Sequence, residues 1–182
     1  LIALKAQSGD VLWRADRPAV RHRYAWLVPT LVAKDGVVLS ADRSPDLPVD
    51  TGNPDMTQVE WRVSGNHILE GGDIMAFSAD TGKKLWTAPT HEGFNSPADV
   101  FVVDGRVFSG ILAWGKQPGI TEVYDLHTGE VVAKRSPDQE KYTLGFGHTR
   151  CYRHKATSKY IIHGRAGVEF LDVNADNVVT DH

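Results

Sequence analysis

The chain has 182 residues, with 20 basic and 23 acidic side chains mixed along its length and a formal net charge of −3. This balance gives no electrostatic reason to expect nucleic acid or a membrane surface as a partner. No apolar run is long enough to span a bilayer. The single cysteine, Cys151, excludes an internal disulfide but leaves open a bridge to another part of a longer chain.

In chain order, the sequence predicts seven β-hairpins, because short β-rich runs alternate with tight turns rich in Gly, Asp, Ser and Thr. One kind has Ser-Gly, Thr-Gly or Asp-Asn near its bend, where glycine supplies a positive φ. It recurs at 1–14, 74–87, 121–134 and 168–181. The other kind occurs at 29–41, 96–110 and, more weakly, 151–164, with Asp35-Gly36, Asp104-Gly105 and Thr157-Ser158 at the bend.

Two successive hairpins make a four-stranded antiparallel unit, and this unit repeats. The equivalent positions Gly9 and Gly82 are 73 residues apart, and the next two intervals, to Gly129 and Asp176, are 47 residues each. Propeller blades repeat every 40 to 50 residues or so, whereas a β-sandwich does not predict self-similar copies. We therefore expect an all-β fold, a β-propeller fragment of four-stranded antiparallel blades with about three complete blades plus the outer half of another.

These units are expected to form part of one β-propeller domain, an incomplete ring within a longer chain. The expected parts are an outer hairpin at 1–15, a blade at 27–88 with an inserted loop at 42–72, and further blades at 96–135 and 148–182. The remaining blades or domains of the same chain are then the first expected partners. Assembly of the ring from several chains is the alternative, since closure removes exposed strand edges.

The pattern A-x-x-x-x-T-G-x-x-x-W around one kind of turn resembles the tryptophan-docking repeat of the quinoprotein (PQQ) dehydrogenase-like β-propellers. The matching residues are Ala3, Gly9 and Trp13 in the first copy and Ala76, Thr81, Gly82 and Trp86 in the second. The third and fourth copies have Ala133 and Thr180 in place of the tryptophan. Those blades are expected to be held by other packing.

Two longer stretches, 91–110 and 147–173, are similar to planctomycete-type proteins known as PQQ-binding-like β-propeller repeat proteins. The resemblance implies a bacterial protein with a periplasmic or otherwise extracytoplasmic location. PQQ is the cofactor that it suggests. The vicinal cysteine pair and the acidic metal and base cluster typical of PQQ enzymes are not visible in this sequence.

Consecutive blades place the segments that enter each innermost strand on one face, beside those that join the second and third strands. On that face we expect 15–28, 88–96, 136–148 and the excursion 42–72. Long loops on a rigid scaffold often carry a binding surface. The excursion, with Trp61 as an anchor, is expected either to bind a ligand or to contact another domain.

Three histidines, His22, His91 and His148, lie in segments that enter successive blades. If they converge, neutral imidazoles offer a site for a divalent metal such as zinc; otherwise their distribution is fortuitous. The motif His148-x-x-Cys151-x-x-His154 does not form a site on a continuous strand, because alternate side chains point to opposite faces. Cys151 is expected to be a small buried hydrophobe.

The densest basic patch comprises Arg150, Arg153, His154 and Lys155. It predicts either a site for a small anionic ligand, bound through charge-assisted hydrogen bonds, or structural pairing with acidic neighbours such as Asp99. Asn95 and Asp99 complete the expected ligand-binding residues on this face.

The function that these features favour is a binding or scaffolding module of a larger extracytoplasmic protein. Its ligand or protein partner is expected on the loop-bearing face near the central channel. The alternative is a PQQ-dependent quinoprotein-type oxidoreductase domain. A third hypothesis, hydrolase or lyase chemistry with channel histidines, has no motif in its support.

Overall fold

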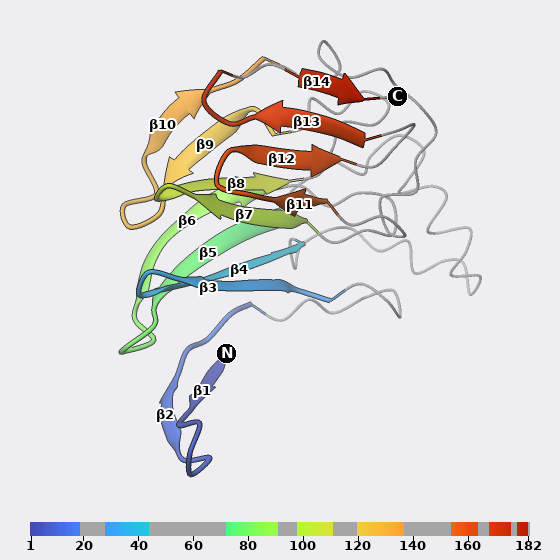
Figure 1. Ribbon diagram of the computed structural model, residues 1–182. Coiled ribbons are helices and arrows are strands. Elements are labelled where there is room, and N and C mark those ends of the chain that lie inside the picture. Colours follow the sequence, from blue (N-terminus) through green and yellow to red (C-terminus); the bar gives the residue numbers. More distant parts are fainter. Residues whose placement is uncertain are drawn as a thin grey trace, which may run out of the picture.

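The computed structural model describes residues 1–18, 28–43, 72–90, 98–110, 120–136, 154–163, 168–175 and 178–181. Strands and turns make up this part of the chain, which contains no helix. The strands form three four-stranded antiparallel sheets and one two-stranded hairpin, arranged as successive blades (Figure 1). The fold is therefore a β-propeller fragment, as the repeats predict.

Within each sheet the strands follow one another in chain order. The first blade contributes β1 (Ile2–Leu4) and β2 (Val11–Arg14), and the second β3 (Thr30–Lys34), β4 (Val37–Arg43), β5 (Gly72–Ser78) and β6 (Lys84–Thr90). The third has β7 (Asp99–Val103), β8 (Arg106–Gly110), β9 (Glu122–Asp125) and β10 (Val131–Lys134). The fourth has β11 (Lys155–Ala156), β12 (Tyr160–His163), β13 (Val168–Asp172) and β14 (Val178–Asp181).

Turn chemistry sets where most of these hairpins bend. Asp35 and Gly36 have φ values of 46° and 78°, as a two-residue hairpin turn with both central residues in the left-handed region requires. The fourth blade has no glycine at this position. There the backbone N–H of Thr157 donates to the carbonyl of Tyr160, so the bend falls at Ser158-Lys159, one residue later than the sequence suggested.

The hairpin turns of each blade lie at one end of its strands, which we call the turn side (left in Figure 1 for the second, third and fourth blades, and at the bottom for the first). This follows from antiparallel pairing: the β3–β4 and β5–β6 turns share one end of a sheet. The opposite end, the loop side, is where β4 ends and β5 begins, and where the chain leaves β6 for β7. The predicted insertion at 42–72 and the segments that enter the innermost strands start and finish on this side.

Alternation along the outer strand β6 shows how a blade covers its neighbour. Trp86, Ala88 and Thr90 are buried, whereas the residues between them are exposed. Pro89 is tolerated because β6 is the outer strand of its sheet and needs no ladder N–H on its free edge. One apolar core lies between the second and third blades and another between the third and fourth.

Tryptophans of one blade contact the β-turn of the next at the first two joints. The indole N–H of Trp13 donates to the carbonyl of Ala79 at 2.7 Å, and that of Trp86 donates to the carbonyl of Leu126 at 2.9 Å. Each ring lies on a turn glycine: a Cβ at Gly82 or Gly129 would approach the ring to 2.6 Å. The two joints therefore use the same contact, displaced by one blade.

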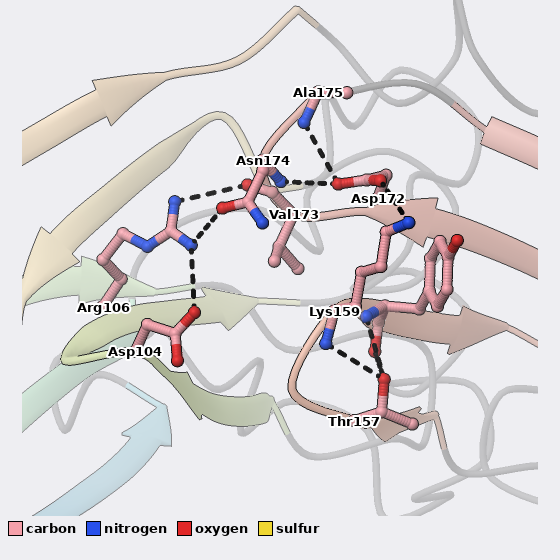
Figure 2. A network of polar contacts seen from close by, with 9 residues as sticks. Asp104, Arg106, Thr157, Lys159, Asp172, Val173, Asn174 and Ala175 are labelled. Carbon is pink, nitrogen blue, oxygen red and sulfur yellow. Dashed lines mark hydrogen bonds and ion pairs between the residues drawn. The ribbon is translucent and has the colours of Figure 1, made fainter.

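The joint between the third and fourth blades uses a different donor (Figure 2). Val173 occupies the position of Ala79 and Leu126, and its backbone N–H makes the equivalent turn bond, to the carbonyl of Lys159. Its own carbonyl accepts from the guanidinium of Arg106, at 3.4 Å, on β8. The other end of that guanidinium donates to the Oδ1 of Asn174 at 2.7 Å. An arginine thus donates to the carbonyl that an indole reaches at the other joints.

Candidate functional site

Buried polar side chains concentrate toward the loop side. Every buried polar or charged side chain in the described ranges lies at mid-strand or nearer the loop side, or just beyond a loop-side strand end. They are Ser40, Asp42, Thr90, Asp99, Ser109, Arg135, His154 and Glu169. Burying such groups is costly unless they are paired. The loop side is therefore where the buried polar groups of the described residues are concentrated.

Asp99 and His154 lie together at the loop-side ends of two innermost strands. Asp99 opens β7 and His154 immediately precedes β11, so the pair crosses the joint between the third and fourth blades. The Nε2 atom of His154 is 3.7 Å from the Oδ2 atom of Asp99, and the two residues are 7% and 3% exposed. When the imidazole is protonated, this contact is an ion pair in a largely dry setting.

Of the predicted ligand-binding residues, the structure describes these two and brings them together. Asp99 was expected as a neighbour of an arginine, and its described partner is the imidazole of His154. That the two bind a ligand stays a prediction. The other predicted residues lie outside the described ranges: His22, Trp61, His91, Asn95, His148, Arg150 and Arg153.

The predicted metal site depends on His22, His91 and His148, all outside the described residues, as is Cys151. Convergence of the three imidazoles therefore stays a prediction. Within the described part of the chain, no three His, Cys, Asp or Glu side chains are grouped to hold a metal ion.

Arg17 forms a second loop-side cluster that the sequence interpretation missed. Its guanidinium donates to the carbonyl of Ser40 at 2.9 Å and to the carbonyl of Asp73 at 2.8 Å, and its Nε lies 3.7 Å from the Oδ2 of Asp42. Because Arg17 follows β2, it links the first blade to the end of β4 and the start of β5. It therefore fixes the two strand ends that flank 44–71.

The second joint has a neutral contact at the equivalent place. Thr90 lies eight residues after its turn glycine, as Arg17 does after Gly9, and Ser109 corresponds to Ser40. The hydroxyls of Thr90 and Ser109 are 2.6 Å apart and buried. When the repeats are aligned on their turn glycines, Arg17 falls at the same position as Thr90. The alignment would therefore have identified Arg17 as a charged residue at an otherwise neutral position.

Two polar contacts lie within and beside the β9–β10 hairpin of the third blade. Arg135 donates to the carbonyl of Ile120. The hydroxyl of Tyr124 donates to the Oε2 of Glu122 at 3.0 Å. Burial, and then this carboxylate, raise the pKa of Tyr124 far above its ordinary value. Tyr124 consequently stays a neutral donor beneath Trp86, whose ring centroid is 6.2 Å away.

Sequence comparison relates the chain to quinoprotein dehydrogenases. A stretch of 62 residues, 32% of this chain and 9% of the relative, is 36% identical to a quinohemoprotein alcohol dehydrogenase of Comamonas testosteroni. A stretch of 100 residues, 53% of this chain and 11% of the relative, is 29% identical to the quinohemoprotein alcohol dehydrogenase ADH-IIG of Pseudomonas putida. The matches thus span about a tenth of the length of these curated relatives. No family model matches the chain.

These similarities support the resemblance to the quinoprotein dehydrogenase-like propellers at the level of the superfamily. In the part of the chain that the structure describes, there is no helix of the length and apolarity that crossing a membrane requires.

Proposed function

We propose that this chain is part of a binding propeller whose ligand-binding surface lies on the loop side, across the joint between the third and fourth blades. The observation that carries the proposal is the buried pair formed by Asp99 and His154 at the loop-side ends of β7 and β11. Buried charged pairs contribute little to stability compared with apolar packing. Stability alone is therefore a weak reason for such a pair, and a role in binding is the reason that we propose.

The ligand class that fits this surface is a small anion, such as a carboxylate or a sulfate. Arg150 and Arg153 lie within five residues before His154, so the sequence supplies two positive charges close to it along the chain. Guanidinium groups bind carboxylates and sulfates through paired hydrogen bonds. We propose that they hold the anion while His154, oriented by Asp99, donates a further hydrogen bond.

The alternative is a quinoprotein-type oxidoreductase domain, which the two alcohol dehydrogenase matches favour. The residues of this segment do not fit a PQQ site of the usual kind. Its one cysteine forms no vicinal pair, and the described residues contain no metal-binding cluster. We therefore place binding first and catalysis second, and derive no chemical step through the cofactor.

The larger context follows from the same resemblance. We propose that the two indole contacts belong to the tryptophan-docking motif of these propellers, and that the protein is bacterial and extracytoplasmic, as the planctomycete-type likeness suggests. The remaining partners are then other blades of the same polypeptide and, on the loop side, a protein or a small anionic ligand.

The test is anion binding to the full-length protein, measured by calorimetry and by thermal shift. Sodium succinate and sodium sulfate serve as probes, with sodium chloride at matched ionic strength as the reference. Replacing Arg150 and Arg153 together by alanine is expected to abolish binding and to leave the melting temperature nearly unchanged. Replacing the exposed Arg14 and Lys134 is the matched control and is expected to leave binding intact.

Two outcomes would decide against the proposal. If neither probe binds the unaltered protein, the anion site is absent. If the Arg150 and Arg153 variant loses stability without losing binding, the two arginines are structural. A separate experiment adds PQQ and Ca²⁺ to the protein and measures the dye-linked oxidation of ethanol. Oxidation that depends on added PQQ would establish the alternative.

A further inference from the structure

Each joint between blades has a turn-side contact at the same carbonyl position, but the donors differ in charge. Trp13 and Trp86 present neutral indole N–H groups to Ala79 and Leu126. At the last joint the donor to the corresponding carbonyl is a guanidinium. Because Ala133 stands where a tryptophan would dock, this joint also loses the apolar area of an indole ring.

The polar contacts around Arg106 form a connected chain (Figure 2). Its guanidinium contacts Asn174 at 2.7 Å and lies 4.0 Å from the carboxylate of Asp104. The backbone N–H of Asn174 donates to Asp172, and the Nζ of Lys159 lies 3.7 Å from the same carboxylate. The Arg106 side chain is 26% exposed, so salt in the solvent can screen its charge.

The loop side of the same joint also depends on charged or ionisable groups, since Asp99 and His154 meet there. Between the second and third blades, the contacts described at this end are neutral. They are the hydroxyl pair of Thr90 and Ser109, and the hydroxyl of Thr30, which donates to the carbonyl of Ala98 at 2.6 Å. The two joints therefore differ at both ends.

We infer that the joint between the third and fourth blades is a salt-sensitive hinge, locked on its turn side by Arg106, and that its opening and closing sets the separation of Asp99 and His154. The other two joints are held by docked indoles and stay closed under the same conditions. The ion pair of Arg17 and Asp42, which also crosses the joint between the first and second blades, is buried and is therefore screened much less by salt. The part of the inference that concerns the site rests on the proposed binding function. The salt sensitivity of the joint does not.

The consequence is a link between the turn side and the loop side of one joint. When Arg106 releases Val173 and Asn174, the turn side of the joint loosens and the fourth blade can pivot on the apolar core that it shares with the third. Asp99 and His154 then separate, because one belongs to β7 and the other leads into β11. An anion that binds the open or the closed joint more tightly shifts the joint toward the arrangement that it prefers.

The experiment is hydrogen exchange of the full-length protein, read by mass spectrometry at 0.1 M and 1 M sodium chloride. This change shortens the screening length from about 10 Å to about 3 Å. Peptides from β12 and β13 are expected to exchange about fivefold faster at high salt, which corresponds to the loss of one charged contact. Peptides from β4 and β5 are expected to change less than about twofold, because indoles lock both of their joints.

Variants identify the lock. Arg106→Ala is expected to give fast exchange in β12 and β13 at both salt concentrations, whereas Arg14→Ala, which removes an exposed arginine on β2, leaves the pattern unchanged. Ala133→Trp combined with Asp176→Gly restores the indole and its glycine, and is expected to abolish the salt response. Ala133→Trp alone is the matched control, because it keeps Asp176 at the position of the turn glycine. The rings of Trp13 and Trp86 leave no room for a Cβ at that position, so the new indole is not expected to dock.

The outcomes separate the joint from the site. An equal salt response in all blades, or no effect of Arg106→Ala, would overturn the hinge. The sulfate affinity of the Ala133→Trp, Asp176→Gly protein tests the coupling: a change of threefold or more, on the order of 0.6 kcal/mol, supports it, and an unchanged affinity overturns it. If sulfate binds neither protein, the proposed function fails, while the exchange data still decide whether the joint is salt-sensitive.

Discussion

The joint between the second and third blades and the joint between the third and fourth share a backbone design but differ in side-chain chemistry. Both place a turn carbonyl, of Leu126 or Val173, opposite a donor from the preceding blade. The joint between the second and third blades uses a buried indole and a hydroxyl pair, and the joint between the third and fourth uses an arginine and a pair of ionisable residues. The repeat therefore keeps the positions at which neighbouring blades contact each other. The side chains at each joint determine whether that contact is sensitive to ions and ligands.

This difference separates scaffold from function within one chain. Neutral, well-packed contacts change little with salt or ligand, because they depend on buried area. Charged contacts are weaker, but they respond to ions and to binding partners. The joint that departs from the repeat is also the joint that carries Asp99 and His154, so the candidate site lies at the joint that we infer to respond to salt.

The largest expected effect comes from Trp86→Ala, which should lower the free energy of unfolding by about 3 to 5 kcal/mol. The residue is 8% exposed, its indole donates to Leu126, and its ring covers Gly129. Urea denaturation of the full-length protein is the measurement. Arg106→Ala should cost only about 0.5 to 1.5 kcal/mol, because that side chain is partly exposed. Equal losses for the two variants would contradict the comparison of the joints.

Next in size is Gly129→Ala, for which Gly9→Ala is a matched control. Both glycines have positive φ, 73° and 76°, so alanine is strained at each by roughly 1 to 2 kcal/mol. A Cβ at Gly9 meets nothing within 4 Å, but at Gly129 it would lie 2.6 Å from the Trp86 ring. We expect an additional loss of about 1 to 3 kcal/mol at Gly129 only. Thermal melts that show equal losses would mean that the indole can move aside.

Thr90→Val probes the neutral contact at the loop side of the second joint. It removes a hydroxyl 2.6 Å from that of Ser109 and leaves the serine buried, at a cost of about 1 to 3 kcal/mol. Adding Ser109→Ala should recover part of that loss, since no orphaned hydroxyl remains. A double-mutant cycle measured by urea denaturation checks this. Simple additivity of the two single losses would show that the hydroxyls are not coupled.

Much of this fold could be predicted from the sequence because its signals are local. The Asp-Gly and Thr-Gly turns require positive φ, and the structure has it at Asp35, Gly36, Gly82 and Gly129. The bend of the weakest hairpin was misplaced by one residue because no glycine marks it. There the hydroxyl of Thr157 accepts from the backbone N–H groups two and three residues ahead, a signal that threonine gives only weakly.

The joints and the candidate site were harder to predict, because their partners come from different strands of different blades. Ala133 shows that an indole is missing, but the replacement, Arg106, lies on β8 and not in the same column. The contact between Asp99 and His154 likewise joins residues in separate repeats. Only the register of whole blades brings such residues together, and a repeat pattern within one blade does not contain it.

The smallest expected effect concerns the acidic residues that cap the turns. Hydrogen bonds from the backbone N–H groups of Asn174 and Ala175 hold the pKa of Asp172 below its ordinary value, and Lys159 lowers it further. Asp125 is capped in the same way, first by Thr128. A carboxylate with a lowered folded-state pKa stabilises the protein above its unfolded value, near pH 4, and that stability is lost as the pH falls through the folded value.

Asp172→Asn and Asp125→Asn should therefore each lower the urea midpoint slightly at pH 7, and the difference from the unaltered protein should vanish toward pH 2. Asp172→Asn should have the larger effect, because Asp172 also holds Asn174 in place to accept from Arg106. High salt should reduce this excess, since it depends on the charged joint. Equal effects of the two substitutions at every salt concentration would show that the turn cap of the fourth blade and the Arg106 contact act independently.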